Sequence, residues 1–194
     1  MNTKPSLRLT HQACAATLLL LFAVNHATAT EDLPEIFYFD TKTTAVRLDV
    51  ERGQRGIATT VTTQTWAYDV QLTNKTFREL PPLIVQYNLF YAQDMPGTTT
   101  GPVLRQHAST FVAPSELGNN RTLEFRTDEV ELSSTRLDAN YRWGSGARPR
   151  SRDRLQGIWL RVVDEEGNIK YETSSPANIT SEGWVEPPQL AAKE

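Results

Sequence analysis

Apolar side chains recur at every second position along much of the chain after residue 35. The clearest case is the stretch 66–91, WAYDVQLTNKTFRELPPLIVQYNLFY, in which two alternating runs flank a polar turn at Asn74. A period of two places each bulky series on one face of a pleated strand. The stretch therefore predicts two long strands that supply most of the core. The expected core residues are Trp66, Tyr68, Val70, Leu72, Val85, Tyr87, Leu89, Ile158 and Leu160.

Further strands are predicted on both sides of this stretch, each bounded by Gly, Pro, Asn or Asp. They cover residues 36–40, 45–51, 59–65 leading into Trp66, 103–112, 121–127 with an extension through Val130 and Leu132, 155–163, and 169–173. Segment 138–153 contains two glycines and a proline and is predicted to be a loop. Residues 164–168 form a predicted hairpin loop in which Gly167 can supply a positive φ. No helix of more than two turns is predicted, and strands at this spacing favour an antiparallel β-sandwich.

Two segments carry a resemblance to known sandwich domains. YDVQLTN, a turn and LIVQYNLFY resemble paired strands of immunoglobulin-like or fibronectin-type-III-like domains, and GIWLRVVDEEGNIKYETSSP resembles the closing hairpin of such a domain. The resemblance spans residues 36–184 and implies an all-β, immunoglobulin-like antiparallel sandwich of seven or eight strands. The cysteine pair of antibody-type domains is missing, and architecture of this kind implies no particular activity.

The N-terminus has the three parts of a secretory signal peptide. Lys4 and Arg8 precede the apolar run AATLLLLFAV, and small residues follow up to Ala29. We expect cleavage after Ala29, which divides the chain into a signal peptide (1–29), a single β-sandwich domain (30–186) and a mobile C-terminal tail (187–194). The apolar run is shorter than the roughly 20 residues that span a bilayer, so no stable membrane span is expected. The mature protein is predicted to be exported, to a periplasm or to the extracellular space.

Cleavage of the signal peptide would leave few side chains of the kinds that catalytic and zinc sites use. It removes Cys14, the only cysteine, and leaves His107 as the only histidine. Thiol catalysis is thereby excluded, and a Ser-His-Asp site would depend on His107 alone, whose expected role is that of a strand residue. Zinc sites usually draw three or four ligands from His and Cys, so none is expected. The full chain has a net charge of −3, which does not suggest nucleic-acid binding.

Calcium needs only oxygen ligands, and two acidic groups offer them. One is Asp164, Glu165 and Glu166 with Asn168, and the other is Asp128, Glu129 and Glu131. Neither has the ligand spacing of an EF-hand, so we interpret both as solvated turns or strand edges and expect no metal or other cofactor.

The most unusual local feature is a cluster of arginines around one tryptophan in the predicted loop. The candidate ligand-binding residues are Arg142, Trp143, Arg148, Arg150, Arg152 and Arg154. Guanidinium groups present planar donors that match carboxylate, sulfate and phosphate groups. The expected partner is an acidic polymer or a partner protein; the alternative is a solvated loop interrupted by Asp153.

Three Asn-x-Thr triplets begin at Asn74, Asn120 and Asn178, and each lies in a predicted turn. In a eukaryotic secretory pathway each would be a glycan acceptor, whereas Asn74 can instead serve as a turn residue.

The leading hypothesis is an exported, non-enzymatic β-sandwich that acts as a binding or structural module. The alternative is a carbohydrate- or polyanion-binding module that uses Trp143 and the neighbouring arginines. A glycosidase that uses two carboxylates is a third hypothesis, but with 23 acidic residues some pair always has suitable spacing.

Overall fold

The computed structural model describes residues 36–56 and 58–188. These belong to one compact unit, Glu35–Glu194. The predicted signal peptide and all but the first two residues of the predicted tail lie outside the described residues. Among those described, no helix has the length and apolar character needed to cross a membrane.

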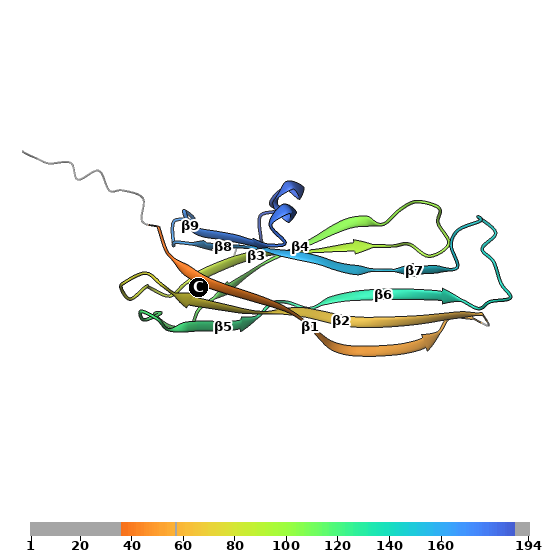
Figure 1. Cartoon of the computed structure of the whole chain (residues 1–194), viewed down its shortest axis with the longest axis horizontal. Coiled ribbons are helices and arrows are strands. Elements are labelled where there is room, and N and C mark those ends of the chain that lie inside the picture. Colours follow the sequence, from red (N-terminus) through yellow and green to blue (C-terminus); the bar gives the residue numbers. More distant parts are fainter. Residues whose placement is uncertain (1–35, 57, 189–194) are drawn as a thin grey trace, which may run out of the picture. The chain divides into compact units, whose positions relative to one another are not determined.

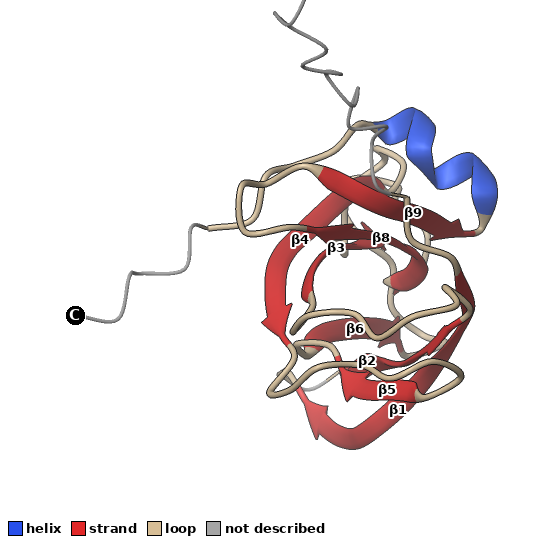
Figure 2. Cartoon of the chain, turned by 90° about the vertical axis from the view of Figure 1, so that its left-hand side faces the viewer, coloured by secondary structure: helices blue, strands red, loops and turns tan. Residues whose placement is uncertain are grey.

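The described residues form two antiparallel sheets (Figure 1, Figure 2). The first sheet has the order β1-β2-β6-β7, and β5 also pairs with β2. The second sheet has the order β4-β3-β8-β9. The strands of the first sheet are β1 (Phe39–Gln54), β2 (Thr59–Asn74), β5 (Thr122–Arg126), β6 (Val130–Leu137) and β7 (Arg150–Arg152). Those of the second are β3 (Ile84–Gln93), β4 (Val103–Val112), β8 (Arg154–Val163) and β9 (Ile169–Ser175), followed by the 3₁₀ helix η1 (Ala177–Glu182). The all-β sandwich is confirmed, with nine strands in the described residues rather than seven or eight.

The alternating side chains of β2, β3 and β8 form the core between the sheets. All the predicted core residues except one are buried, and they belong to one hydrophobic cluster. The exception is Trp66, which is only partly buried at the border of that cluster. Its indole Nε1 donates a hydrogen bond to Oε1 of Gln64 at 3.1 Å, so its polar end remains near solvent. The period-two pattern therefore predicted the core correctly, but not where the core ends along β2.

The two strands that dominate the sequence pattern do not pair with each other, contrary to expectation. β2 pairs with β1, β5 and β6, whereas β3 pairs with β4 and β8. They face each other across the core instead. The connection between them contains Pro81 and Pro82, which cannot donate to a ladder, and is too long for a tight hairpin. It carries the chain from one sheet to the other.

Asn74 holds that connection in place. Its side chain is fully buried, and Nδ2 donates to the carbonyl oxygens of Arg78, Leu117 and Gly118 at 2.8, 3.0 and 3.2 Å. Its Oδ1 accepts a hydrogen bond from the amide of Thr76 at 2.8 Å. The turn-residue interpretation of Asn74 is therefore correct, because its side chain bonds the backbone of the residues that follow it. Asn120 and Asn178 are exposed.

Three other segments differ from expectation. Residues 36–40 and 45–51 were predicted as separate strands, but most of them belong to the single long strand β1. The segment after Arg121 forms two strands, β5 and β6, because the chain turns between Arg126 and Val130 while both continue to pair with β2. Segment 138–153, predicted to be all loop, contains β7. The three-residue strand β7 is too short to show a period in the sequence.

The chain changes sheets at Asp153, between β7 and β8. Arg152 lies opposite Ser134 in the first sheet, and Arg154 lies opposite Ala92 in the second. The Asp153 carboxylate accepts hydrogen bonds from the amides of Asp94 and Ser133, both at 2.8 Å. One side chain therefore ties the end of β3 to the middle of β6 at the point of crossing.

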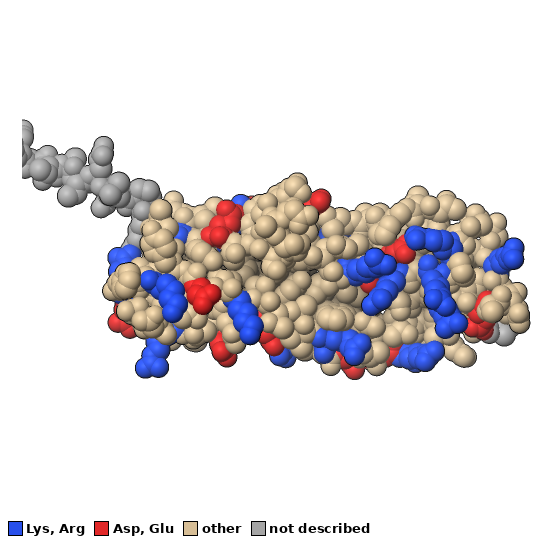
Figure 3. Space-filling view, viewed as in Figure 1, with Lys and Arg blue, Asp and Glu red and all other residues tan. Residues whose placement is uncertain are grey.

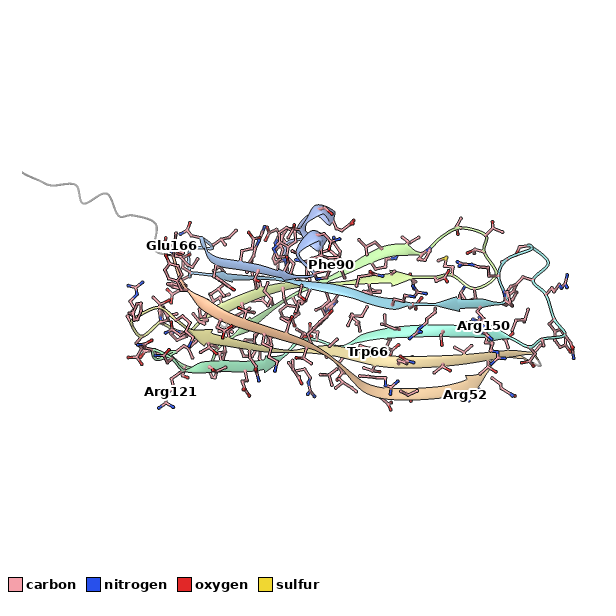
Figure 4. The ribbon with its side chains drawn as sticks, viewed as in Figure 1. Arg52, Trp66, Phe90, Arg121, Arg150 and Glu166 are labelled. Carbon is pink, nitrogen blue, oxygen red and sulfur yellow. The ribbon has the colours of Figure 1, made fainter. Side chains whose placement is uncertain are left out.

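The outward face of the second sheet is covered by the segment that follows β9. Trp184 packs edge-on against Trp159 at 5.3 Å, and the Arg161 guanidinium lies 4.1 Å from the Trp184 ring. Phe90 from β3, labelled in Figure 4, and Ile179 from η1 belong to this second, smaller cluster, and Leu104 packs against it. Trp159 is thus buried, but on the outside of the sandwich and not between the sheets.

Candidate ligand-binding site

The predicted arginine-rich loop is held against the neighbouring β3–β4 loop. The Trp143 ring lies over Gly97 so closely that a Cβ atom there would lie 3.3 Å from Cε3 of the tryptophan. Gly97 also has a φ of +77°, which side-chain-bearing residues rarely adopt. The Ser145 hydroxyl donates to the Gly97 carbonyl at 2.6 Å. These contacts fix the loop and place Trp143, half-buried, at the end of the sandwich.

Strand pairing brings four arginines to one face of the first sheet. Arg136 on β6 lies directly opposite Arg150 on β7. Two residues away along β6, at Ser134, the register runs from Arg52 on β1 through Thr62 and Ser134 to Arg152 on β7. All four arginines are exposed, and directly opposed residues in a ladder have Cβ atoms about 4.5–5.5 Å apart. Figure 3 shows Lys and Arg side chains gathered toward this end of the sheets.

These arginines are poorly neutralised by the protein itself. Within residues 36–56 and 58–188, the side chains of Arg136, Arg150 and Arg152 form no ion pair. Arg148 approaches Asp94 at 3.8 Å, but its side chain is 72% exposed, and such a pair contributes little. The positive charge of this face is therefore available to a ligand.

Two of these arginines, Arg136 and Arg150, border a cavity of about 420 Å³, which we call the arginine pocket. Arg136, Arg142 and Arg150 line it together with Tyr141 and Trp143, and Asp138 supplies the one carboxylate that the described residues place there. Guanidinium groups beside two aromatic rings suit a planar or tetrahedral anion attached to a larger body. The volume lies within the range of roughly 300–1,000 Å³ that is usual for ligand sites.

The structure gathers some of the sequence-predicted site residues and separates others. Arg142, Trp143 and Arg150 line the arginine pocket, and Arg152 lies beside it on the same face. Arg148 and Arg154 are exposed but do not line this cavity. Sequence reasoning missed Arg136 and Tyr141: Arg136 joins the pocket only through the β6–β7 register, while Tyr141 was already visible next to Arg142.

A second cavity, of about 590 Å³, lies on the other face of the same strands, and we call it the hydroxyl groove. Side chains alternate across β7, so Ser151 is buried on this face while Arg150 and Arg152 are exposed on the other. The Ser and Thr side chains that line the groove are Thr59, Ser133, Thr135 and Ser151. Trp143 also lines it, and therefore borders both cavities.

His107, the one histidine among the described residues, has a partner that the sequence did not reveal. His107 Nε2 lies 3.0 Å from Oδ2 of Asp128. Burial opposes ionisation of Asp128, but hydrogen bonds from Ser109, His107 and Tyr87 outweigh it and lower the pKa of this carboxyl. Since Ser109 bonds to the carboxylate and not to the imidazole, this cluster lacks the nucleophile–base contact of a catalytic triad.

Among the described residues, no three His, Cys, Asp or Glu side chains are grouped as metal ligands would be. In the β8–β9 hairpin, Asp164 accepts hydrogen bonds from the amides of Glu166 and Asn168 at 3.0 and 2.7 Å and pairs with Lys170 at 3.0 Å. The acidic residues there form a solvated turn, and Gly167 has the expected positive φ, +86°.

No protein-family profile matches the chain, and no curated protein matches it. The chain is similar to several solved structures. One is a Bordetella pertussis protein described as a "putative ApaA protein", with 12% identity, 72% of this chain and 89% of that chain covered, and a TM-score of 0.36. Another is the structural-genomics target SoR45, with 10% identity, 80% and 92% covered, and a TM-score of 0.34. A third comes from Akkermansia muciniphila, with 10% identity, 78% of each chain covered, and a TM-score of 0.25.

Proposed function

We propose that this protein is an exported, non-enzymatic binding module of the immunoglobulin-like or fibronectin-type-III-like kind, and that it binds anionic polymers at the arginine pocket. The observation that carries the proposal is the direct opposition of Arg136 and Arg150 across β6 and β7. Like charges directly opposite each other destabilise a sheet. A ligand anion between them would remove that repulsion.

The chemistry of the pocket favours an anion over a neutral ligand. Arg136, Arg142 and Arg150 face one carboxylate, Asp138, so the lining carries excess positive charge. An arginine can donate two parallel hydrogen bonds to one carboxylate, sulfate or phosphate group. The exposed row that contains Arg52 and Arg152 extends the positive surface beyond the pocket, which suits a polymer more than a small ion.

The sequence supports export and independence from disulfides. The N-terminal segment has the order of charged, apolar and small residues that secretory signals have, and removal of residues 1–29 leaves no cysteine. A binding module outside the cell or in a periplasm meets acidic polymers of surfaces and matrices, and its fold would not depend on an oxidising compartment.

Retention of the mature chain, residues 30–194, on an immobilised sulfated polysaccharide tests the proposal. We expect wild-type protein to be retained at low salt and released as salt rises, because salt screens the attraction between exposed arginines and anionic groups. The double substitution Arg136→Gln/Arg150→Gln should abolish retention.

The matched control is Lys75→Gln/Arg121→Gln, which removes the same charge from exposed residues elsewhere; Figure 4 shows Arg121 at the opposite end of the sheets from Arg150. Control protein should be retained like the wild type. Equal loss of retention in both double variants would mean that net charge, and not the arginine pocket, governs binding, and the proposal would fail.

A further inference from the structure

We infer that the ligand is an acidic polysaccharide in which charged and uncharged sugar residues alternate: the arginine pocket holds a charged group and the hydroxyl groove holds an adjacent neutral ring. This inference rests on the proposed function and names its ligand class. It depends on the contrast between the two cavities that Trp143 separates.

The hydroxyl groove contains polar groups that the protein does not use. Thr135 and Ser151 are cross-strand neighbours, only 7% and 8% exposed, and both line the groove. Within the described part of the chain, neither hydroxyl makes a hydrogen bond, and the same holds for the hydroxyls of Thr59 and Ser133. Each hydroxyl can donate one hydrogen bond and accept others, as the hydroxyls of a sugar can. The groove thus offers uncharged hydroxyl groups that can both donate and accept hydrogen bonds.

The charge of the groove is opposite to that of the arginine pocket. Its carboxylates belong to Asp94 and Asp153, and among the described residues Arg55 is the one arginine that lines it; Arg148 approaches Asp94 at 3.8 Å with a largely exposed side chain. Backbone amides hold these carboxylates in place: Asp153 binds the amides of Asp94 and Ser133, and Asp94 Oδ2 accepts from the amide of Arg152 at 3.2 Å. Two fixed carboxylates repel a second anionic group. A polymer with a charge on every unit, such as polyphosphate or a nucleic acid, would therefore fit the pocket but not the groove.

Trp143 completes the match to a sugar. Its ring is fixed by Gly97 and Ser145 and lies where the two cavities adjoin. A pyranose has an apolar C–H face and a rim of hydroxyls, and sites that pair an aromatic ring with a few placed polar groups recognise such bodies. A chain that passes Trp143 would place a carboxylate-bearing unit among the arginines and the next, neutral unit among the hydroxyls.

The test compares two polymers on the mature chain by calorimetric titration: a polysaccharide of alternating uronate and N-acetylhexosamine units, and linear polyphosphate with the same number of charges. The test variant is Thr135→Val/Ser151→Ala, which removes two groove hydroxyls at nearly constant volume. We expect it to weaken polysaccharide binding about tenfold and to leave polyphosphate binding unchanged. Arg136→Gln/Arg150→Gln should weaken both. The control Thr110→Val/Ser115→Ala removes two hydroxyls that line neither cavity and should change neither.

Each outcome decides between the two proposals. If polyphosphate binds through the arginines while the polysaccharide does not, or if the groove variant leaves polysaccharide binding intact, the alternation inference is overturned and the proposed function stands. If neither polymer binds, both fail. Should the double groove variant not fold, Ser151→Ala alone removes a single hydroxyl, and an unchanged polysaccharide affinity in that variant contradicts the inference.

Discussion

Arg136 and Arg150 occupy directly opposed positions on β6 and β7, and within the described residues no carboxylate pairs with either. The two like charges therefore weaken the pairing of β6 with β7 at the proposed site. A ligand anion should relieve this repulsion, and replacement of either arginine by a neutral residue should relieve it too. The repulsion can therefore be measured in the ligand-free protein by substitution.

We predict that Arg150→Gln stabilises the ligand-free protein at low salt by about 0.2–1 kcal/mol, the usual size of a cross-strand pair effect. Salt screens exposed charges, so the gain should disappear at about 1 M salt. Urea unfolding at both salt concentrations measures it, with Arg121→Gln as the control that should show no salt-dependent gain. A destabilised Arg150→Gln protein at low salt would indicate that a favourable contact of Arg150 outweighs its repulsion from Arg136.

Asp153→Asn should destabilise the fold by about 1–3 kcal/mol. Both carboxylate oxygens accept backbone amide hydrogen bonds, from Asp94 and from Ser133. An asparagine keeps one acceptor oxygen but replaces the other with an NH₂ group, which cannot accept a hydrogen bond from a backbone amide. That amide then lacks a partner, and the fold bears the cost of an unmade hydrogen bond. Chemical unfolding measures the change, with the exposed Asp40→Asn as control. If the two variants are equally stable, Asp153 does not hold the sheets together as described.

Asn74→Asp should cost about 3 kcal/mol or more and so threaten folding. The substitution replaces the Nδ2 donor, which binds three carbonyl oxygens, with an oxygen that would face them without a proton to share. Asn120→Asp and Asn178→Asp, at exposed positions, should change stability little. Thermal unfolding of the three variants compares them.

The same geometry predicts a glycan pattern. If the chain is made in a eukaryotic secretory host, the folded product should carry glycans at Asn120 and Asn178 but not at the buried Asn74. Peptide mass spectrometry reads the occupancy of each site. A folded product with a glycan on Asn74 would contradict the burial of this side chain.

Acid stability should depend on Asp164. Hydrogen bonds from the Asn168 side chain and amide, with help from Lys170, outweigh desolvation and lower the pKa of this carboxyl from 3.8 to about 2. A carboxyl whose pKa is lower in the folded state stabilises the fold above its unfolded pKa, and that contribution is lost as the pH falls from about 4 to 2. Asp164→Asn should therefore lower the melting temperature at pH 7 and have less effect at pH 2. Equal losses at the two pH values would rule out the ionised carboxylate as the cause.

The alternation of large side chains was sufficient to predict the fold class and most of the core. The sequence pattern predicts one buried face that contains Tyr68, Val70 and Leu72, and in the structure all three belong to the same buried cluster. Pairing was not predictable in the same way, because the period of two says which face is buried and not which strand is adjacent. β2 and β3 were therefore expected together, although the Asn74-anchored connection places them in different sheets.

The candidate site was only half visible in the sequence. Arg142, Trp143 and Arg150 cluster along the chain, so the arginine-rich segment was found. Arg136 is separated from Arg150 by a loop, and only the hydrogen-bonded register places the two opposite each other. The hydroxyl groove was missed altogether, because Ser151 lies in a segment predicted to be loop and Thr135 lies beyond the predicted strand, so no inward-facing pair was expected there.

The cover formed by Trp184 has a consequence for how the molecule is made. Trp184 follows all nine described strands in the chain, yet it shields Trp159 and takes part in the cluster that contains Phe90. During synthesis, every strand therefore leaves the ribosome before Trp184 can cover the outer surface of the β3–β8 pair. A nascent chain at that stage exposes aromatic surface, which can bind chaperones or aggregate with other chains. Folding is complete only after the last described segment has docked.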